Sequence, residues 1–127
     1  MESLVLEALG VRFSVCKVAD FSGVDLSQPF CFTGTTDEER SLVCPEGLVP
    51  DNVVERDDGW MGMRIVGQLD FSLIGILARI AGILAENGIS IFAVSTFNTD
   101  YILTREENFA RALAVLKGAG YTVLDSR

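Results

Sequence analysis

Hydrophobic residues between positions 73 and 84 recur three or four positions apart: Leu73, Ile76, Leu77, Ile80, Ile83 and Leu84. This spacing places them on one face of an amphipathic helix. Asp70 or Ser72 can accept hydrogen bonds from the free amides of the first turn, and Gly88 stands where a left-handed C-terminal cap is needed. We therefore predict a first helix between these capping positions.

A second helical pattern lies nearer the C-terminus. Its apolar face contains Phe109, Ala112, Leu113 and Leu116. Thr104 and Glu107 have the spacing of a capping box, in which each side chain bonds the backbone amide of the other's position. The glycines that follow at 118 and 120 favour an end to the helix there.

Short apolar runs surround the two predicted helices. They are "MRIVGQL" (63–69), "ISIFAVSTF" (89–97), "YILT" (101–104) and "YTVL" (121–124). Residues 89–97 are rich in β-branched and aromatic side chains, which is typical of a strand buried on both faces. The order β-α-β-β-α-β predicts an α+β, ferredoxin-like fold, in which two helices cover one side of a sheet.

The N-terminal section has strand patterns and little sign of helix. Alternation in residues 3–18, interrupted at Gly10, predicts two strands in a hairpin, and residues 30–35 and 40–45 predict two shorter strands. Residues 46–60 are rich in acidic side chains and are interpreted as a connector. We therefore predict two units, a strand-rich one over residues 1–62 and a complete one over residues 63–127.

Charge limits the kinds of partner. The 127 residues include 18 acidic and 10 basic side chains, for a formal net charge of −8. This charge opposes attraction to nucleic-acid backbones and anionic lipid, so we expect neither nucleic acid nor membrane as a partner. Hydrophobic residues make up 49% of the chain, enough for a real core. With no long apolar run, the sequence predicts a cytoplasmic protein.

The residue types also limit the chemistry. The chain contains no histidine, which removes the commonest general base and metal ligand. Cys16, Cys31 and Cys44 show no metal-binding spacing and are interpreted as small buried hydrophobes in a reducing compartment. With no catalytic motif recognised, we expect a protein that is not an enzyme, with no metal and no cofactor.

Polar groups suited to a small ligand occur at two places. The start of the first helix offers unpaired amides, which favour a ligand carboxylate, and Gly75 lets a ligand approach without a Cβ in the way. Asp100, in "STFNTD" (95–100), accepts hydrogen bonds and suits an ammonium or guanidinium group. Two alternatives stay open: Asp70 as a helix cap only, and residues 97–100 as a turn only.

The segment "LDFSLIGILARIAGILAENGISIFAVSTFNTDYILTREENFARALAVLKGAGY" resembles the ACT domain, a small module that binds ligands and regulates amino-acid metabolism. Within that superfamily it is most similar to the C-terminal regulatory modules of aspartokinases and to the CASTOR-type arginine sensors. The similarity covers residues 64–123. Residues 1–50 resemble the shortened N-terminal ACT repeat of the same group, so the resemblance implies two tandem ACT-like units.

This resemblance implies binding rather than catalysis, with an amino acid held at an interface between modules. Thr96, Phe97 and Asp100 match positions that contact arginine in the CASTOR-type sensors, and Gly75 matches a glycine beside the ligand. The sequence departs from those sensors where Asp70 replaces a glycine and where position 73 holds leucine in place of a ligand-contacting glutamate. These departures argue against arginine as the ligand.

The residues and the resemblance together predict one ligand site. Its members are Asp70, Phe71, Ser72, Leu73, Ile74, Gly75, Ser95, Thr96, Phe97, Asn98 and Asp100. We expect an amino-acid ligand, a homodimer and a regulatory protein partner. The alternative function is a structural or dimerisation module that binds no ligand.

Overall fold

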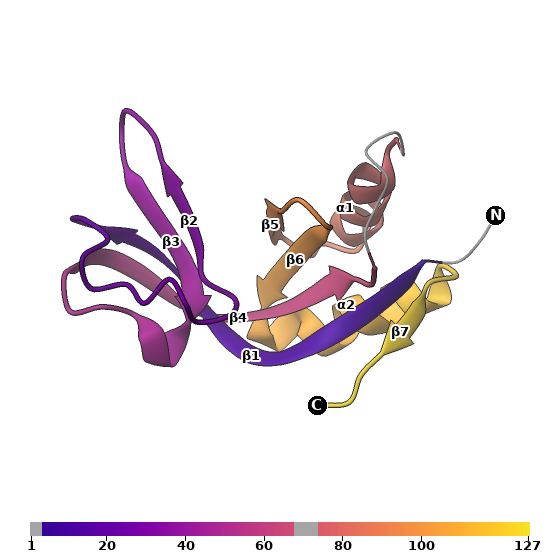
Figure 1. Ribbon diagram of the computed structural model, residues 1–127. Helices are drawn as coiled ribbons and strands as arrows, with labels where there is room; N and C mark the ends of the chain where they lie inside the picture. Colours follow the sequence, from indigo (N-terminus) through magenta and orange to yellow (C-terminus); the bar gives the residue numbers. More distant parts are fainter. Residues whose placement is uncertain (1–3, 68–73) are drawn as a thin grey trace. The chain divides into compact units, whose positions relative to one another are not determined.

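The protein is described by a computed structural model that covers residues 4–67 and 74–127 (Figure 1). Asp70, Phe71, Ser72 and Leu73 of the predicted site lie outside the described residues. The elements are β1 (Val5–Val18), β2 (Phe32–Thr35), β3 (Arg40–Pro45), the 3-10 helix η1 (Glu46–Leu48), β4 (Val53–Ile65), α1 (Ile76–Glu86), β5 (Ile91–Ser95), β6 (Asp100–Arg105), α2 (Glu106–Gly118) and β7 (Thr122–Leu124).

The chain forms two compact units. Unit 1 contains the residues up to Gly10 together with Met61–Arg127, and unit 2 contains Val11–Trp60. The first residues therefore belong with the C-terminal part of the chain, whereas the sequence division at residue 62 assigned them to the N-terminal part. That residues 1–62 are a shortened ACT repeat stays a prediction.

The sheet of unit 1 contains one strand more than its β-α-β-β-α-β order requires. Its strand order is β7-β1-β4-β6-β5, so β1 lies between β4 and β7. β1 pairs with β7 in parallel, with Val5 opposite Thr122 and Glu7 opposite Leu124. On the other edge the Val66 amide donates to the Val5 carbonyl at 2.8 Å. We call residues 5–10 the inserted strand.

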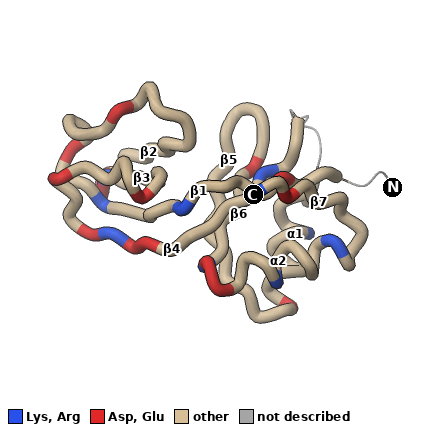
Figure 2. Tube along the Cα trace, turned by 90° about the horizontal axis from the view of Figure 1, so that it is seen from below, with Lys and Arg blue, Asp and Glu red and all other residues tan. Residues whose placement is uncertain are grey.

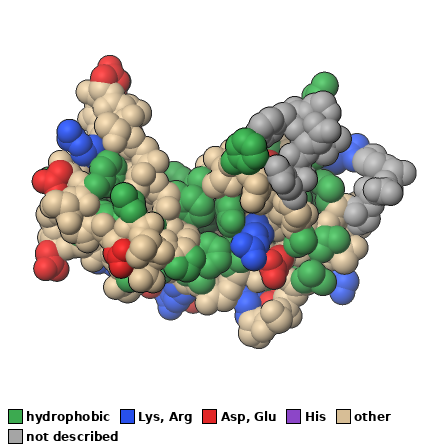
Figure 3. All heavy atoms as spheres, in the orientation of Figure 1, with side chains coloured by type: hydrophobic (Ala, Val, Ile, Leu, Met, Phe, Trp, Pro, Cys, Tyr) green, Lys and Arg blue, Asp and Glu red, His purple; other side chains and the backbone are tan. Residues whose placement is uncertain are grey.

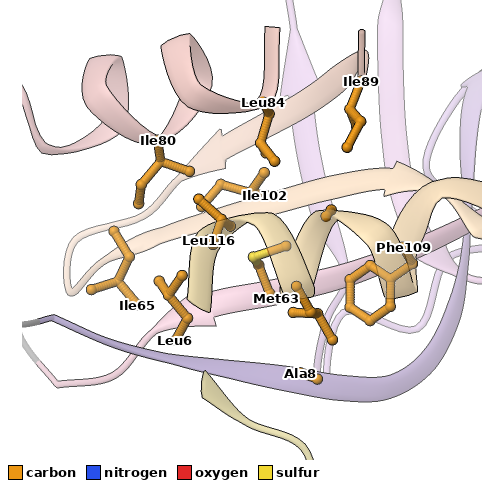
Figure 4. Packing of buried hydrophobic residues seen from close by; sticks show 12 residues of the cluster. Leu6, Ala8, Met63, Ile65, Ile80, Leu84, Ile89, Ile102, Phe109 and Leu116 are labelled. Carbon is orange, nitrogen blue, oxygen red and sulfur yellow. The ribbon is translucent and has the colours of Figure 1, made fainter. Parts of the chain in front are cut away.

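Both helices pack on one face of this sheet, as the amphipathic patterns predicted (Figure 4). Alternate residues of the strands point into the same core because side chains in a strand alternate between faces. The core joins Leu6, Ala8, Met63, Ile65 and Ile102 of the strands to Ile80, Leu84, Phe109, Ala112, Leu113 and Leu116 of the helices, with Ile89 beside them. The sequence-derived helical faces are therefore the buried faces.

Both helices end in the same glycine motif. Gly88 follows α1 with a φ of 71° and Gly120 follows α2 with a φ of 108°, both in the left-handed region that favours glycine. In each case the next amide donates to the carbonyl five residues earlier, Ile89 to Leu84 at 2.9 Å and Tyr121 to Leu116 at 3.1 Å. The predicted C-terminal cap at Gly88 is confirmed.

The predicted capping of α2 is wrong. α2 begins after Arg105, whose side chain makes no capping bond. Thr104 lies one residue before the N-cap, buried in β6, and its hydroxyl donates to the carbonyl of Arg105 at 3.1 Å, so the predicted capping box is not formed. α1 begins after Gly75, and the two side chains predicted to cap it, Asp70 and Ser72, lie outside the described residues.

Three strand predictions also need correction. Residues 5–18 form the single strand β1, not the expected hairpin with a turn at Gly10. Glycine is compatible with extended backbone as well as with a turn, so Gly10 did not have to end the strand. The expected connector over residues 46–60 contains η1 and the first half of β4. Residues 91–95 form β5 as predicted, but β5 is a terminal strand with Ala93 and Ser95 exposed, so it is not buried on both faces.

Unit 2 is built on an antiparallel sheet in which β3 lies between β1 and β2. Its core contains Cys16, Val18, Leu42 and Cys44, with Cys31 packed against them. Burial raises the pKa of the Cys44 thiol to about 12, so this thiol stays protonated and behaves as a small hydrophobe. The interpretation of Cys16 and Cys44 as buried hydrophobes is confirmed.

Candidate functional site

The turn between β5 and β6 has a fixed geometry. Its backbone closes through a bond from the Thr96 amide to the Thr99 carbonyl at 2.9 Å. Ser95 and Asp100 are opposite each other at its base, and the Ser95 hydroxyl donates to the Asp100 carboxylate at 2.6 Å. The turn therefore holds the half-buried carboxylate of Asp100 in a defined position.

Thr99 attaches this turn to β4. Its hydroxyl donates to the carbonyl of Ile65, the last residue of β4, at 2.9 Å, and the residue is 6% exposed. The carboxyl end of β4 and the β5–β6 turn consequently lie side by side. The sequence-based site did not include Thr99, and the signal available was its place inside the polar "STFNTD" segment between two apolar runs.

The start of α1 is formed by backbone rather than by a capping side chain. Gly75 occupies the N-cap with a φ of 77° and a ψ of 10°. No heavy atom of the described residues lies within 4 Å of a Cβ added at Gly75, so these residues leave room for a side chain. The sequence explained glycine at position 75 by the close approach of a ligand. The positive φ, which favours glycine, is a second reason for glycine there and is independent of any ligand.

The predicted site residues differ in exposure. Ser95, Thr96 and Asn98 are exposed, the Phe97 side chain is 70% exposed, and Ile74 is 95% exposed. Ile74 and Phe97 are therefore the two large apolar side chains that the described part of the predicted site exposes to water. The structure thus brings residues 95–100 together in one turn and places it against the end of β4.

An ion pair lies beside the site in the sheet of unit 1. Arg64 of β4 bonds Glu7 of the inserted strand at 2.9 Å. The hydrogen bonds that Arg64 makes as donor, first with Tyr101 and second with Glu7, raise the pKa of Arg64 above its ordinary value. The Arg64 guanidinium therefore stays charged and engaged with these two side chains.

The described residues were searched for metal-binding clusters and for membrane-spanning helices. Within residues 4–67 and 74–127, no group of three or more histidine, cysteine, aspartate or glutamate side chains has an arrangement that could hold a metal ion. Among the helices in the same ranges, none combines the length and apolar character needed to cross a bilayer.

Comparison with known proteins gives matches at the level of sequence and of fold. The ACT domain profile matches residues 55–118. The bovine and human proteins named cytosolic arginine sensor for mTORC1 subunit 1 are each 44% identical over 59 residues. That alignment covers 46% of this chain and 18% of each sensor, so the chain matches less than a fifth of their length.

Solved structures extend the match to the whole chain. A protein of Agrobacterium tumefaciens superposes with a TM-score of 0.87 at 28% identity and covers 100% of this chain and 96% of its own. The ligand-free regulatory subunit of aspartate kinase from Thermus thermophilus superposes with a TM-score of 0.60 at 12% identity, covering 91% and 96%.

The matches agree with the architecture of unit 1, in which two helices cover one face of a sheet. The resemblance to arginine sensors and to aspartokinase regulatory domains, inferred from the sequence, is confirmed. The chain belongs to the ACT domain family.

Proposed function

We propose that the protein is an amino-acid-binding regulatory module rather than an enzyme. The observation that carries this proposal is the β5–β6 turn, in which Ser95 positions the Asp100 carboxylate and Thr99 ties the turn to the end of β4. The ACT family assignment supports it, because the relatives include proteins named as an arginine sensor and as a regulatory subunit of an amino-acid kinase.

The proposed site combines complementary groups for the two ends of an amino acid. Asp100 accepts hydrogen bonds from an ammonium or a basic side chain, while the free amides at the start of α1, after Gly75, attract a carboxylate. The exposed ring of Phe97 contacts the carbon chain between them. The site also includes Asp70, Phe71, Ser72, Leu73, Ile74, Ser95, Thr96 and Asn98.

Removing one charge tests this site. Asp100→Asn keeps an oxygen that accepts from the Ser95 hydroxyl but loses the carboxylate charge. We expect it to weaken amino-acid binding by about 1.5–3 kcal/mol, the range for a hydrogen bond to a charged group, with little change in the melting temperature. Isothermal titration calorimetry, with the ligand chosen by a thermal-shift screen of the amino acids, measures the change.

Asp37→Asn is the matched control. Asp37 is exposed and lies in unit 2, and its substitution changes the net charge by the same amount as Asp100→Asn. We expect it to leave affinity unchanged. If Asp100→Asn lowers stability but preserves affinity, the carboxylate only supports the turn and the ligand site lies elsewhere. A screen with no amino acid that raises the melting temperature would instead favour the alternative function, a module that only assembles.

We further propose that the protein is a homodimer whose contact includes Phe97. Exposed apolar side chains at Val66, Ile74 and Phe97 in unit 1 support this assembly. Among the described strands β5 is terminal in the sheet, and the edge of a terminal strand favours pairing with another chain. Figure 3 shows one side of the molecule, on which hydrophobic side chains reach the surface among polar ones. A regulatory protein partner would contact the assembled form.

The assembly is tested by light scattering on Phe97→Ser and Leu26→Ser. Both replaced side chains are similarly exposed, at 70% and 66%, but Leu26 lies in unit 2. We expect the Phe97 variant to shift toward the monomer mass and the Leu26 variant to keep the dimer mass, because burial of an aromatic ring stabilises an interface. A monomer mass for the unsubstituted protein at high concentration would refute the homodimer.

A further inference from the structure

Two cysteines of unit 2 lie opposite each other where the hairpin of β2 and β3 ends. The last pair of its ladder joins Phe32 to Val43, and one further step along the same register places Cys31 opposite Cys44. The two strands run side by side in both views of the chain (Figure 1 and Figure 2). Opposite residues of paired strands direct their side chains to the same face of the sheet, so the two thiols share a face.

The hydrogen-bond pattern of the hairpin sets the distance between these two residues. At the turn, the Thr36 amide donates to the Glu39 carbonyl at 2.9 Å, which makes this a hydrogen-bonded pair. Bonded and non-bonded pairs alternate along an antiparallel ladder, and Cys31 is an odd number of steps from Thr36. The pair of Cys31 and Cys44 is therefore non-bonded, with its Cα atoms about 4.5 Å apart, which is within the range of a disulfide.

The packing of the three thiols agrees with this register. Cys31 is half-buried and packs against the core cluster that contains Cys16 and Cys44, both of which are buried. On β1, Ser14 is the residue opposite Cys44, and Cys16 lies two residues beyond Ser14, with its Sγ 3.2 Å from the Ser14 hydroxyl. Diagonal Cα atoms are about 7–8 Å apart, which is too far for a disulfide. Cys44 is thus placed to join Cys31 and not Cys16.

We propose that Cys31 and Cys44 form a reversible disulfide when the protein meets a peroxide. Hydrogen peroxide oxidises the Cys31 thiol to a sulfenic acid and is itself reduced to water. The Cys44 sulfur then attacks the Cys31 sulfur, so that the S–S bond forms, the S–O bond breaks, and the hydroxyl leaves as water with the proton of the Cys44 thiol. A dithiol reductant reverses the link by thiol–disulfide exchange.

The link would fasten β2, which is terminal among the described strands of its sheet, to its only listed neighbour in that order, β3. In the reduced protein both thiols remain part of the unit 2 core. This device lies in unit 2 and does not rest on the amino-acid site proposed for unit 1.

Burial makes the oxidation slow. Burial first and the charge of Asp25 second raise the pKa of Cys31, and burial raises the pKa of Cys44 to about 12. The thiolate is the reactive form, and below these pKa values its concentration rises about tenfold for each unit of pH. We therefore expect disulfide formation that is slow at neutral pH and accelerates as the pH is raised.

Peptide mapping of the full chain tests which thiols join. The reduced protein is treated with hydrogen peroxide, its remaining thiols are alkylated, and it is digested with trypsin. Cleavage after lysine and arginine separates the three cysteines into residues 13–17, 18–40 and 41–56. We expect a disulfide between 18–40 and 41–56, with the chain at monomer mass on a denaturing gel without reductant. A link to 13–17, a link between chains, or sulfinic acid without any link would overturn the proposal.

The melting temperature gives a second test. Oxidation should raise it by about 5–10 °C, because a cross-link restricts the unfolded chain. Cys31→Ala should abolish this rise. Cys16→Ala is the matched control, since Cys16 belongs to the same core cluster but lies diagonal to Cys44, and it should keep the rise. Each variant is compared with its own reduced form, so that a general loss of stability cancels. A rise that persists in Cys31→Ala, or that disappears in Cys16→Ala alone, would refute the pairing.

Discussion

A chain that begins at Met61 will fail to fold, although it contains both helices and four of the strands that form unit 1. The reason is the inserted strand, which lies between β4 and β7 and bonds to both. Without residues 5–10, β7 has no neighbouring strand in the sheet of unit 1, and β4 loses one of its two neighbouring strands. The core also loses Leu6, which is fully buried, and Ala8.

Far-UV circular dichroism and an amide correlation spectrum measure this outcome directly. The shortened chain should show the narrow amide dispersion of an unfolded polypeptide. The matched control is the chain from Met61 whose Arg127 is joined through a Gly/Ser linker to residues 1–10, which restores the inserted strand and omits unit 2. We expect this permuted chain to fold. A folded spectrum for the chain from Met61 alone would mean that β7 moves beside β4 and that the inserted strand is dispensable.

The helices of unit 1 could be predicted from sequence because their signals are local. Ile80 and Leu84 recur at helical spacing, and the same residues are fully buried in the structure. Gly88 was predicted as a left-handed cap for the same reason, since a positive φ favours glycine regardless of the rest of the fold. Periodicity and cap chemistry both act within a few residues.

The inserted strand could not be predicted because strand neighbours are set by contacts far apart in sequence. Alternation in residues 4–9 shows that one face of a strand is buried, but it does not select the sheet or the position in it. Thr104 illustrates the same limit at shorter range. Its spacing to Glu107 fits a capping box, yet its position on β6 turns its side chain into the interior.

For the candidate site, the sequence could suggest residue types but not the contacts that hold the turn in place. The segment containing Asp100 was recognised because acceptors in a turn suit a cationic group. The bond from Thr99 to the Ile65 carbonyl joins residues 34 positions apart, so no local pattern could reveal it. The attachment of this turn to β4 is therefore visible only in the folded chain, and the ligand-contacting role of Asp100 stays a prediction.

The contribution of the inserted strand to stability can be measured at one side chain. Leu6→Ala should lower the free energy of unfolding by about 2–5 kcal/mol, because it removes a fully buried side chain from a core shared by both helices and leaves a cavity. Urea denaturation followed by circular dichroism gives the value. Leu124→Ala is the matched control, since Leu124 lies on the adjacent strand β7 and is 48% exposed, and we expect a loss of about 1 kcal/mol or less. Equal losses in the two variants would show that the inserted strand pairs with the sheet through its backbone but adds little to the core.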